Sequence, residues 1–95
     1  MYPNKIVLVT GASRGVGLEI TKHFIKNGAT VIGLSKGVSS FQHEQYKHFS
    51  VDIGDAESII NCFKREIGKQ FKRIDIVINN AAVMTSQYYK IMPVK

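Results

Sequence analysis

Residues 10–17 read Thr10-Gly11-Ala12-Ser13-Arg14-Gly15-Val16-Gly17, and the fold predicted for this chain follows from them. This stretch comes after a short, β-branched, apolar run at residues 5–10, which is typical of a strand buried on both faces. After it, apolar residues recur at helical spacing until Asn27-Gly28 ends the helix. A glycine-rich turn from a parallel strand into a helix directs backbone N–H groups toward an anion. The stretch therefore predicts a site for a dinucleotide pyrophosphate.

Each glycine of this stretch has its own physical reason. Gly11 allows the sharp turn, Gly15 lets the backbone approach a phosphate, and Gly17 lets helix and strand pack closely. The spacing Gly-x3-Gly-x-Gly is a weak signal by itself, because a turn into a helix needs glycine for structural reasons alone. The rest of the chain supports the functional interpretation.

Further strands are expected at residues 29–34, 46–51 and 74–78, and a second helix at 56–71 with Asp55 as its N-cap. This order predicts an α/β fold, the first half of a doubly wound parallel sheet. Right-handed crossovers place the strands in the spatial order 3-2-1-4. Ligands bind such sheets where the order reverses, at the carboxyl ends of the strands. The segments expected at that edge are polar or rich in glycine: 10–17, 35–36, 52–53 and 79–82.

Composition sets the outer limits. The chain has 95 residues, 44% of them hydrophobic, which makes one domain or a piece of one. Its net charge of +6 comes partly from cations late in the second helix, but no aromatic residues are interleaved with them for stacking on bases, so a nucleic-acid partner is not expected. No apolar run approaches the roughly 18 residues that span a bilayer, so no membrane partner is expected. The single cysteine, Cys62, fits a reducing compartment and predicts a cytoplasmic protein. It is expected to be a small packing residue.

The histidines His23, His43 and His48 lack metal-ligand spacing, so no metal site is expected.

With these elements in place, the chain resembles the short-chain dehydrogenase/reductase family, whose fold is of the Rossmann type. The resemblance covers residues from about 5 to about 85 and rests on residues 10–17, on Asp52 after the third strand, and on Asn79-Asn80-Ala81-Ala82. One departure is Ala82, where the family usually has glycine. The resemblance implies cofactor-binding roles for particular positions. Those lining the pyrophosphate and the adenosine ribose would be Gly11, Ser13, Arg14, Gly15, Val16, Gly17, Asn79 and Ala81.

By the same resemblance, Asp52 and the Ile53 backbone N–H would meet the adenine ring. A plainer interpretation makes Asp52 a turn residue at the start of the helix. The two asparagines could likewise hold the central strands together by hydrogen bonds.

The end of the second strand predicts which dinucleotide binds. An acidic residue there would accept from the ribose 2′-OH and repel a 2′-phosphate, but the sequence has Leu34-Ser35-Lys36. Ser35, Lys36 and Arg14 can all meet a phosphate, so NADP(H) is favoured over NAD(H). The alternative is that Lys36 is an ordinary exposed lysine.

No catalytic residue is assigned. The family uses a Ser and a Tyr-x3-Lys pair, and Tyr88 or Tyr89 would need lysine where Met92 and Pro93 stand. Residues 1–85 are therefore interpreted as a dinucleotide-binding half-domain and 86–95 as a truncated tail.

The expected parent is an NAD(P)-dependent oxidoreductase and homo-oligomer that acts on a small carbonyl or alcohol, while this chain alone is expected to be inactive. The alternatives are a non-catalytic dinucleotide-binding or regulatory module, or a degenerate segment without a stable fold.

Overall fold

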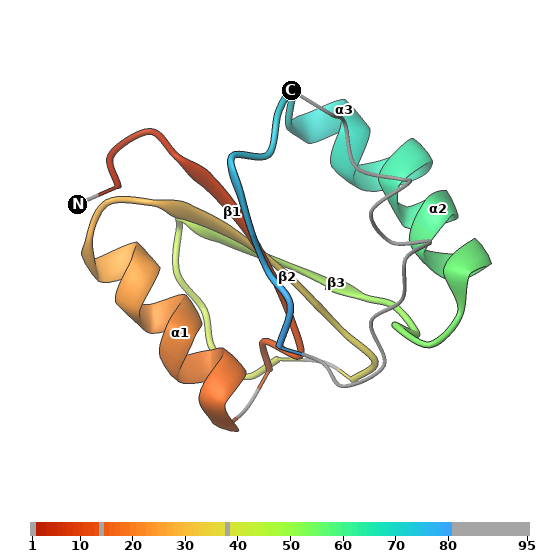
Figure 1. The fold of residues 1–95 in the computed structure, drawn as a ribbon, viewed down its shortest axis with the longest axis horizontal. Coiled ribbons are helices and arrows are strands. Elements are labelled where there is room, and N and C mark those ends of the chain that lie inside the picture. The colour runs from red at the N-terminus through yellow and green to blue at the C-terminus, as the bar shows by residue number, and fades with distance from the viewer. Residues whose placement is uncertain (1, 14, 38, 81–95) are drawn as a thin grey trace.

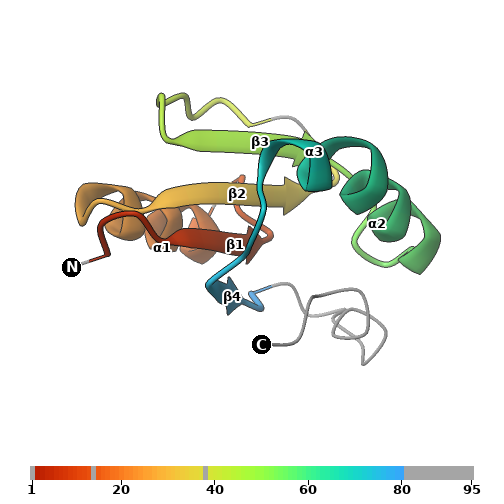
Figure 2. The ribbon, with the colours of Figure 1, turned by 90° about the horizontal axis from the view of Figure 1, so that it is seen from above.

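The computed structural model describes residues 2–13, 15–37 and 39–80. Its core is a four-stranded parallel sheet in the order β3-β2-β1-β4 (Figure 2). The strands are β1 (Ile6–Thr10), β2 (Thr30–Ser35), β3 (Tyr46–Ser50) and β4 (Ile76–Ile78), and helix α1 (Gly15–Lys26) connects β1 to β2. The α/β class and the expected strand order are confirmed. The order reverses at β1, which pairs with β2 on one side and β4 on the other.

The two faces of the sheet are covered by different helices (Figure 1). Alternate strand residues such as Val7, Val9 and Val31 pack with Phe24 and Ile25 of α1. Leu8, Ile32 and Leu34 point the other way, into a second cluster with Ile59 and Ile67 of the helical run after β3. The nearly continuous apolar sequence of β1 and β2 follows from this burial on both faces.

The helical run after β3 differs from a plain α-helix. It consists of α2 (Ala56–Cys62), a wider π-helical turn η1 (Phe63–Ile67), and α3 (Gly68–Gln70). Asp55 is the N-cap as predicted, because its Oδ1 accepts a hydrogen bond from the Glu57 N–H at 3.1 Å. Gly68 donates its backbone N–H to the Phe63 carbonyl, which a Cβ on Gly68 would approach to 2.8 Å. The missing side chain thus leaves room for this carbonyl. The helix was expected to end at about residue 71, and it ends at Gln70, because Phe71 is extended.

The fourth strand is shorter than predicted, because a side chain replaces part of its ladder. The Asp75 N–H donates to the Ile6 carbonyl at 2.8 Å, and the Ile6 N–H donates to Asp75 Oδ2 at 2.8 Å. Arg73 Nε lies 3.1 Å from both carboxylate oxygens of Asp75. The hydrogen bond from the Ile6 N–H is the largest influence on the pKa of Asp75 and lowers it. Desolvation acts in the opposite direction, but the positive charges of Arg73 and Lys5 also lower the pKa, so the net shift is downward. Asp75 therefore anchors the start of β4 to the start of β1.

Among the helices of the described ranges, none has both the length and the apolar character that a membrane span requires.

Candidate functional site

The glycine loop between β1 and α1 has the backbone geometry that its sequence predicts. Gly11 and Gly15 have φ angles of +66° and +61°, a region that favours glycine. A Cβ on Gly17 would lie 1.9 Å from the Gly11 carbonyl oxygen, so only glycine lets the helix approach the loop this closely. A Cβ on Gly15 would meet no described atom within 4 Å. The loop is therefore packed at Gly17 and open at Gly15, where α1 presents its N-terminus.

An open groove of about 710 Å³ begins at this loop and runs along α1 beside β4. The residues that line this groove are mainly apolar, and they include Val16, whose side chain is 68% exposed. The others are Gly15, Glu19, Ile20, His23, Phe24 and Ile78. Ser13, on the other side of Gly15 in sequence, is half-buried. A ligand held at Gly15 would thus have an apolar wall on one side.

The end of β4 is tied to the glycine loop by Asn80. Its backbone N–H donates to Thr10 Oγ1 at 3.0 Å, and its side-chain Nδ2 donates to the Gly11 carbonyl at 3.3 Å. Asn79, which the family resemblance placed against the ribose, is exposed, and its ribose role remains a prediction. The sequence predicted no contact between Asn80 and a cofactor, but the alternative, that the two asparagines hold the central strands together by hydrogen bonds, is confirmed for Asn80. Strand alternation could have found it, because Asn80 has the parity of Ile76 and Ile78, which pack on the α1 side.

Lys36 and Ser35, at the end of β2, lie in different environments. Lys36 is exposed, whereas Ser35 is buried and its Oγ lies 3.3 Å from Nε2 of His48. Two residues of β3 hold the backbone that follows. The Ser50 hydroxyl donates to the Lys36 carbonyl at 2.8 Å, and His48 Nε2 lies 2.8 Å from the Gly37 carbonyl oxygen. The sequence carried no signal for these β3 contacts.

Asp52 forms the turn that leads into α2. Its Oδ1 accepts from the Gly54 N–H at 3.0 Å, and its carbonyl accepts from the Asp55 N–H at 3.0 Å. Asp52 is exposed and lines a polar groove of about 650 Å³ between β3 and α2. Ile53 packs against the apolar cluster that contains Ile59 and Ile67. The turn role left open by the sequence is therefore real, and contact with adenine remains a prediction.

Cys62 packs against the cluster that contains Leu8, Ile59 and Ile67, so its predicted role as a small packing residue is confirmed. Burial, together with the nearby Glu66 carboxylate, raises the pKa of its thiol, so the unreactive protonated form is favoured. Among the described residues, no three side chains of His, Cys, Asp or Glu gather where a metal ion could be held.

The predicted contacts of Arg14 and Ala81 lie outside the described residues, as do Tyr88, Tyr89 and the expected boundary at residue 85.

Residues 5–93 of the chain match the short chain dehydrogenase family. The 3-oxoacyl-acyl-carrier-protein reductase of Vibrio harveyi is 41% identical over 85 residues, covering 83% of this chain and 34% of the relative. A short chain dehydrogenase from Salmonella enterica serovar Typhi superposes with a TM-score of 0.71 at 34% identity, over 83% of this chain and 37% of the other.

A short chain dehydrogenase from Leptospira borgpetersenii, solved with bound NAD+, has a TM-score of 0.76 at 24% identity, over 95% of this chain and 39% of the other. The chain thus spans about a third of the length of the curated relatives that it matches.

Proposed function

This chain belongs to the short-chain dehydrogenase family, and from that premise we propose that residues 1–85 form the dinucleotide-binding half of an NAD(P)-dependent oxidoreductase. The substrate class proposed for the whole enzyme is a small carbonyl or alcohol compound. A bound nicotinamide dinucleotide would supply or accept the hydride. The role of the residues described here is to bind and orient that dinucleotide.

One observation carries the proposal: a glycine loop, open at Gly15, lies at the carboxyl end of β1, where the strand order reverses. Backbone N–H groups at the start of α1 suit the negative charge of a pyrophosphate. The absence of a Cβ at Gly15 leaves the space that a phosphate needs to approach the backbone. Gly11, Ser13, Val16 and Gly17 complete the proposed cradle, and Asn80 holds its carbonyl side in place.

The proposed cofactor is NADP(H) rather than NAD(H). Support comes from the end of β2, where Lys36 is exposed and where no Asp or Glu occurs to repel a 2′-phosphate. Because Ser35 is buried against His48, Lys36 is the proposed main contact, with Arg14 as a second cation and Ser35 as a neighbour. Asp52 and Ile53 remain proposed contacts for adenine, and Asn79 and Ala81 for the ribose.

Calorimetric titration of the 95-residue chain with NADPH and with NADH tests this proposal. We expect tighter binding of NADPH, and a Lys36→Glu variant should lose that preference by weakening NADPH about tenfold or more. Lys47→Glu is the matched control, because Lys47 is exposed on β3 at a position of opposite parity to His48. If the wild-type chain bound neither cofactor, the proposal would be wrong. Equal losses of NADPH affinity in both variants would contradict the role of Lys36.

A further inference from the structure

We propose that His48 is a positioning residue for cofactor selectivity. It holds the backbone at residues 35–37 so that Lys36 is presented to the 2′ substituent of the adenosine ribose. This inference rests on the proposed function. His48 is not placed against the cofactor; it acts through the backbone on which Lys36 is mounted.

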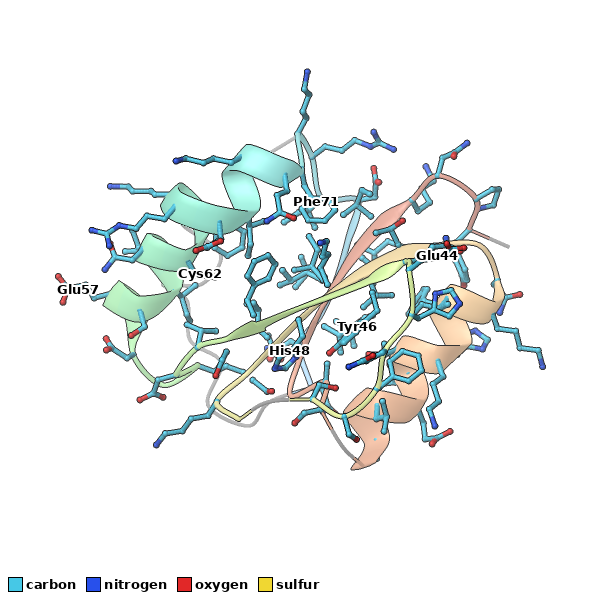
Figure 3. The ribbon with its side chains drawn as sticks, turned by 180° about the vertical axis from the view of Figure 1, so that it is seen from behind. Glu44, Tyr46, His48, Glu57, Cys62 and Phe71 are labelled. Carbon is cyan, nitrogen blue, oxygen red and sulfur yellow. The ribbon has the colours of Figure 1, made fainter. Side chains whose placement is uncertain are left out.

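The hydrogen bonds of His48 define its tautomer. The Gly37 carbonyl oxygen, 2.8 Å from Nε2, can only accept, so Nε2 must carry the hydrogen. In the neutral ring Nδ1 is then an acceptor, and the Tyr46 hydroxyl lies 2.9 Å from it, in position to donate (Figure 3). The neutral imidazole with its hydrogen on Nε2 satisfies both neighbours at once. His48 therefore links a buried phenol to the exposed backbone that follows β2.

Tyr46 is itself held firmly, which gives the link a fixed end. Its ring lies over Gly33 of β2, where a Cβ would come within 2.2 Å of the Tyr46 hydroxyl oxygen. The side chain is buried, and it packs edge-on to the Phe41 ring at a centroid distance of 5.3 Å. Burial raises the pKa of Tyr46 more than its hydrogen bond with Ser39 lowers it, so the phenol keeps its proton for donation.

A second anchor from the same strand acts on the neighbouring peptide. The Ser50 hydroxyl donates to the Lys36 carbonyl at 2.8 Å, and His48 contacts the Gly37 carbonyl. Two successive carbonyls after β2 are thus held from β3. A Cβ on Gly37 would meet no described atom within 4 Å, so Gly37 itself adds no side-chain packing that would hold Lys36. Without His48, the Gly37 carbonyl would keep only the long hydrogen bond from the Ser35 hydroxyl at 3.4 Å, and the Lys36 carbonyl would keep Ser50, so part of the ordering of Lys36 would be left to the cofactor.

The test compares His48→Leu, which removes the donor, with His48→Gln, whose amide nitrogen can replace Nε2. For His48→Leu we expect NADPH affinity to fall about five- to tenfold, because Lys36 would then have to be ordered when the cofactor binds. NADH has no 2′-phosphate to contact Lys36, so its affinity should change less than about twofold. His48→Gln should restore most of the loss. His43→Leu is the control, because His43 lies just before β3 and its ring nitrogen serves the Gln45 N–H instead.

A second readout needs no cofactor. Nitrogen-15 NMR of the imidazole in the wild-type chain should show the hydrogen on Nε2 of His48. Hydrogen on Nδ1, or equal losses of NADPH and NADH affinity in His48→Leu, would overturn the inference while leaving the proposed function intact. A wild-type chain that bound neither dinucleotide would instead overturn the proposed function, and the selectivity role with it.

Discussion

The side-chain amide of Asn80 donates to the carbonyl of Gly11 at 3.3 Å, although the two residues are 69 positions apart in sequence. The backbone N–H of Asn80 also donates to Thr10 Oγ1 at 3.0 Å. A Cβ on Gly17 would lie 2.8 Å from the same Asn80 amide nitrogen. The end of β4, the glycine loop and the first turn of α1 therefore meet at one point. The geometry of the loop depends on all three.

Asn80→Ala should lower the free energy of unfolding by about 1 kcal/mol, the usual value of a hydrogen bond whose carbonyl partner is partly buried. It should also weaken dinucleotide binding, because Gly11 loses its side-chain anchor. Chemical denaturation and calorimetric titration measure the two effects. Asn79→Ala is the control and should stay within about 0.5 kcal/mol, since Asn79 is exposed. Similar losses of stability in both variants would contradict the anchoring role.

Gly17→Ala should destabilise the fold even though alanine is the better helix former. Helix propensity favours the change by about 1 kcal/mol. The new Cβ, however, would lie 1.9 Å from the Gly11 carbonyl oxygen, and overpacking of this kind costs about 1–3 kcal/mol or more. We expect a net loss of about 1 kcal/mol or more in denaturant unfolding. Gly54→Ala, whose Cβ would find its nearest atom at 3.5 Å, should change little. A stabilised Gly17→Ala protein would show that the loop can move away at low cost.

Asp75 should make stability depend on pH in the acidic range. Its pKa is lowered in the folded chain, chiefly by the hydrogen bond from the Ile6 N–H. The contribution of Asp75 to the free energy of unfolding is therefore fully present at pH values above its unfolded pKa of about 3.9. It is lost as the pH falls through the lower pKa of the folded chain. In Asp75→Asn, the thermal midpoint should fall less steeply between about pH 5 and pH 2.

Glu44→Gln, in the exposed loop before β3, is the matched control for that change and should keep the wild-type slope. A difference between Asp75→Asn and wild type that is constant at every pH would contradict the assignment.

The 95-residue chain should bind a dinucleotide without catalysing carbonyl reduction. The reason is that the Tyr-x3-Lys pattern of the family is not matched at Tyr88 or Tyr89. Positioned acid–base groups typically contribute about 100- to 10,000-fold to rate. NADPH oxidation in the presence of aldehydes and ketones measures this. Turnover proportional to the concentration of purified protein, and lost in Lys36→Glu, would show that an acid–base group has been overlooked.

Local pattern determined most of the architecture. The β-branched runs, the helical period after Gly15 and the N-cap at Asp55 depend on neighbours close in sequence, and each formed the element that it predicted. The strand order followed as well, because right-handed crossovers leave few arrangements of these elements. The glycine loop could be predicted for the same reason, since the ability to adopt the positive φ seen at Gly11 and Gly15 is a property of glycine itself.

Which side chains hold the site together depends on contacts between segments that are far apart in the sequence. Asn80 rather than Asn79 reaches the loop, because the face of β4 that packs on the α1 side sets the parity of the residues after it. The Ser35 side chain is buried and the Lys36 side chain is exposed, because β2 ends at Ser35, which is paired with Ser50 of β3. The contact between His48 and Gly37 joins segments that meet only once β2 and β3 are in register. Strand alternation could have identified Asn80, but the contacts from β3 to the backbone after β2 depend on long-range pairing, which no local pattern in the sequence encodes.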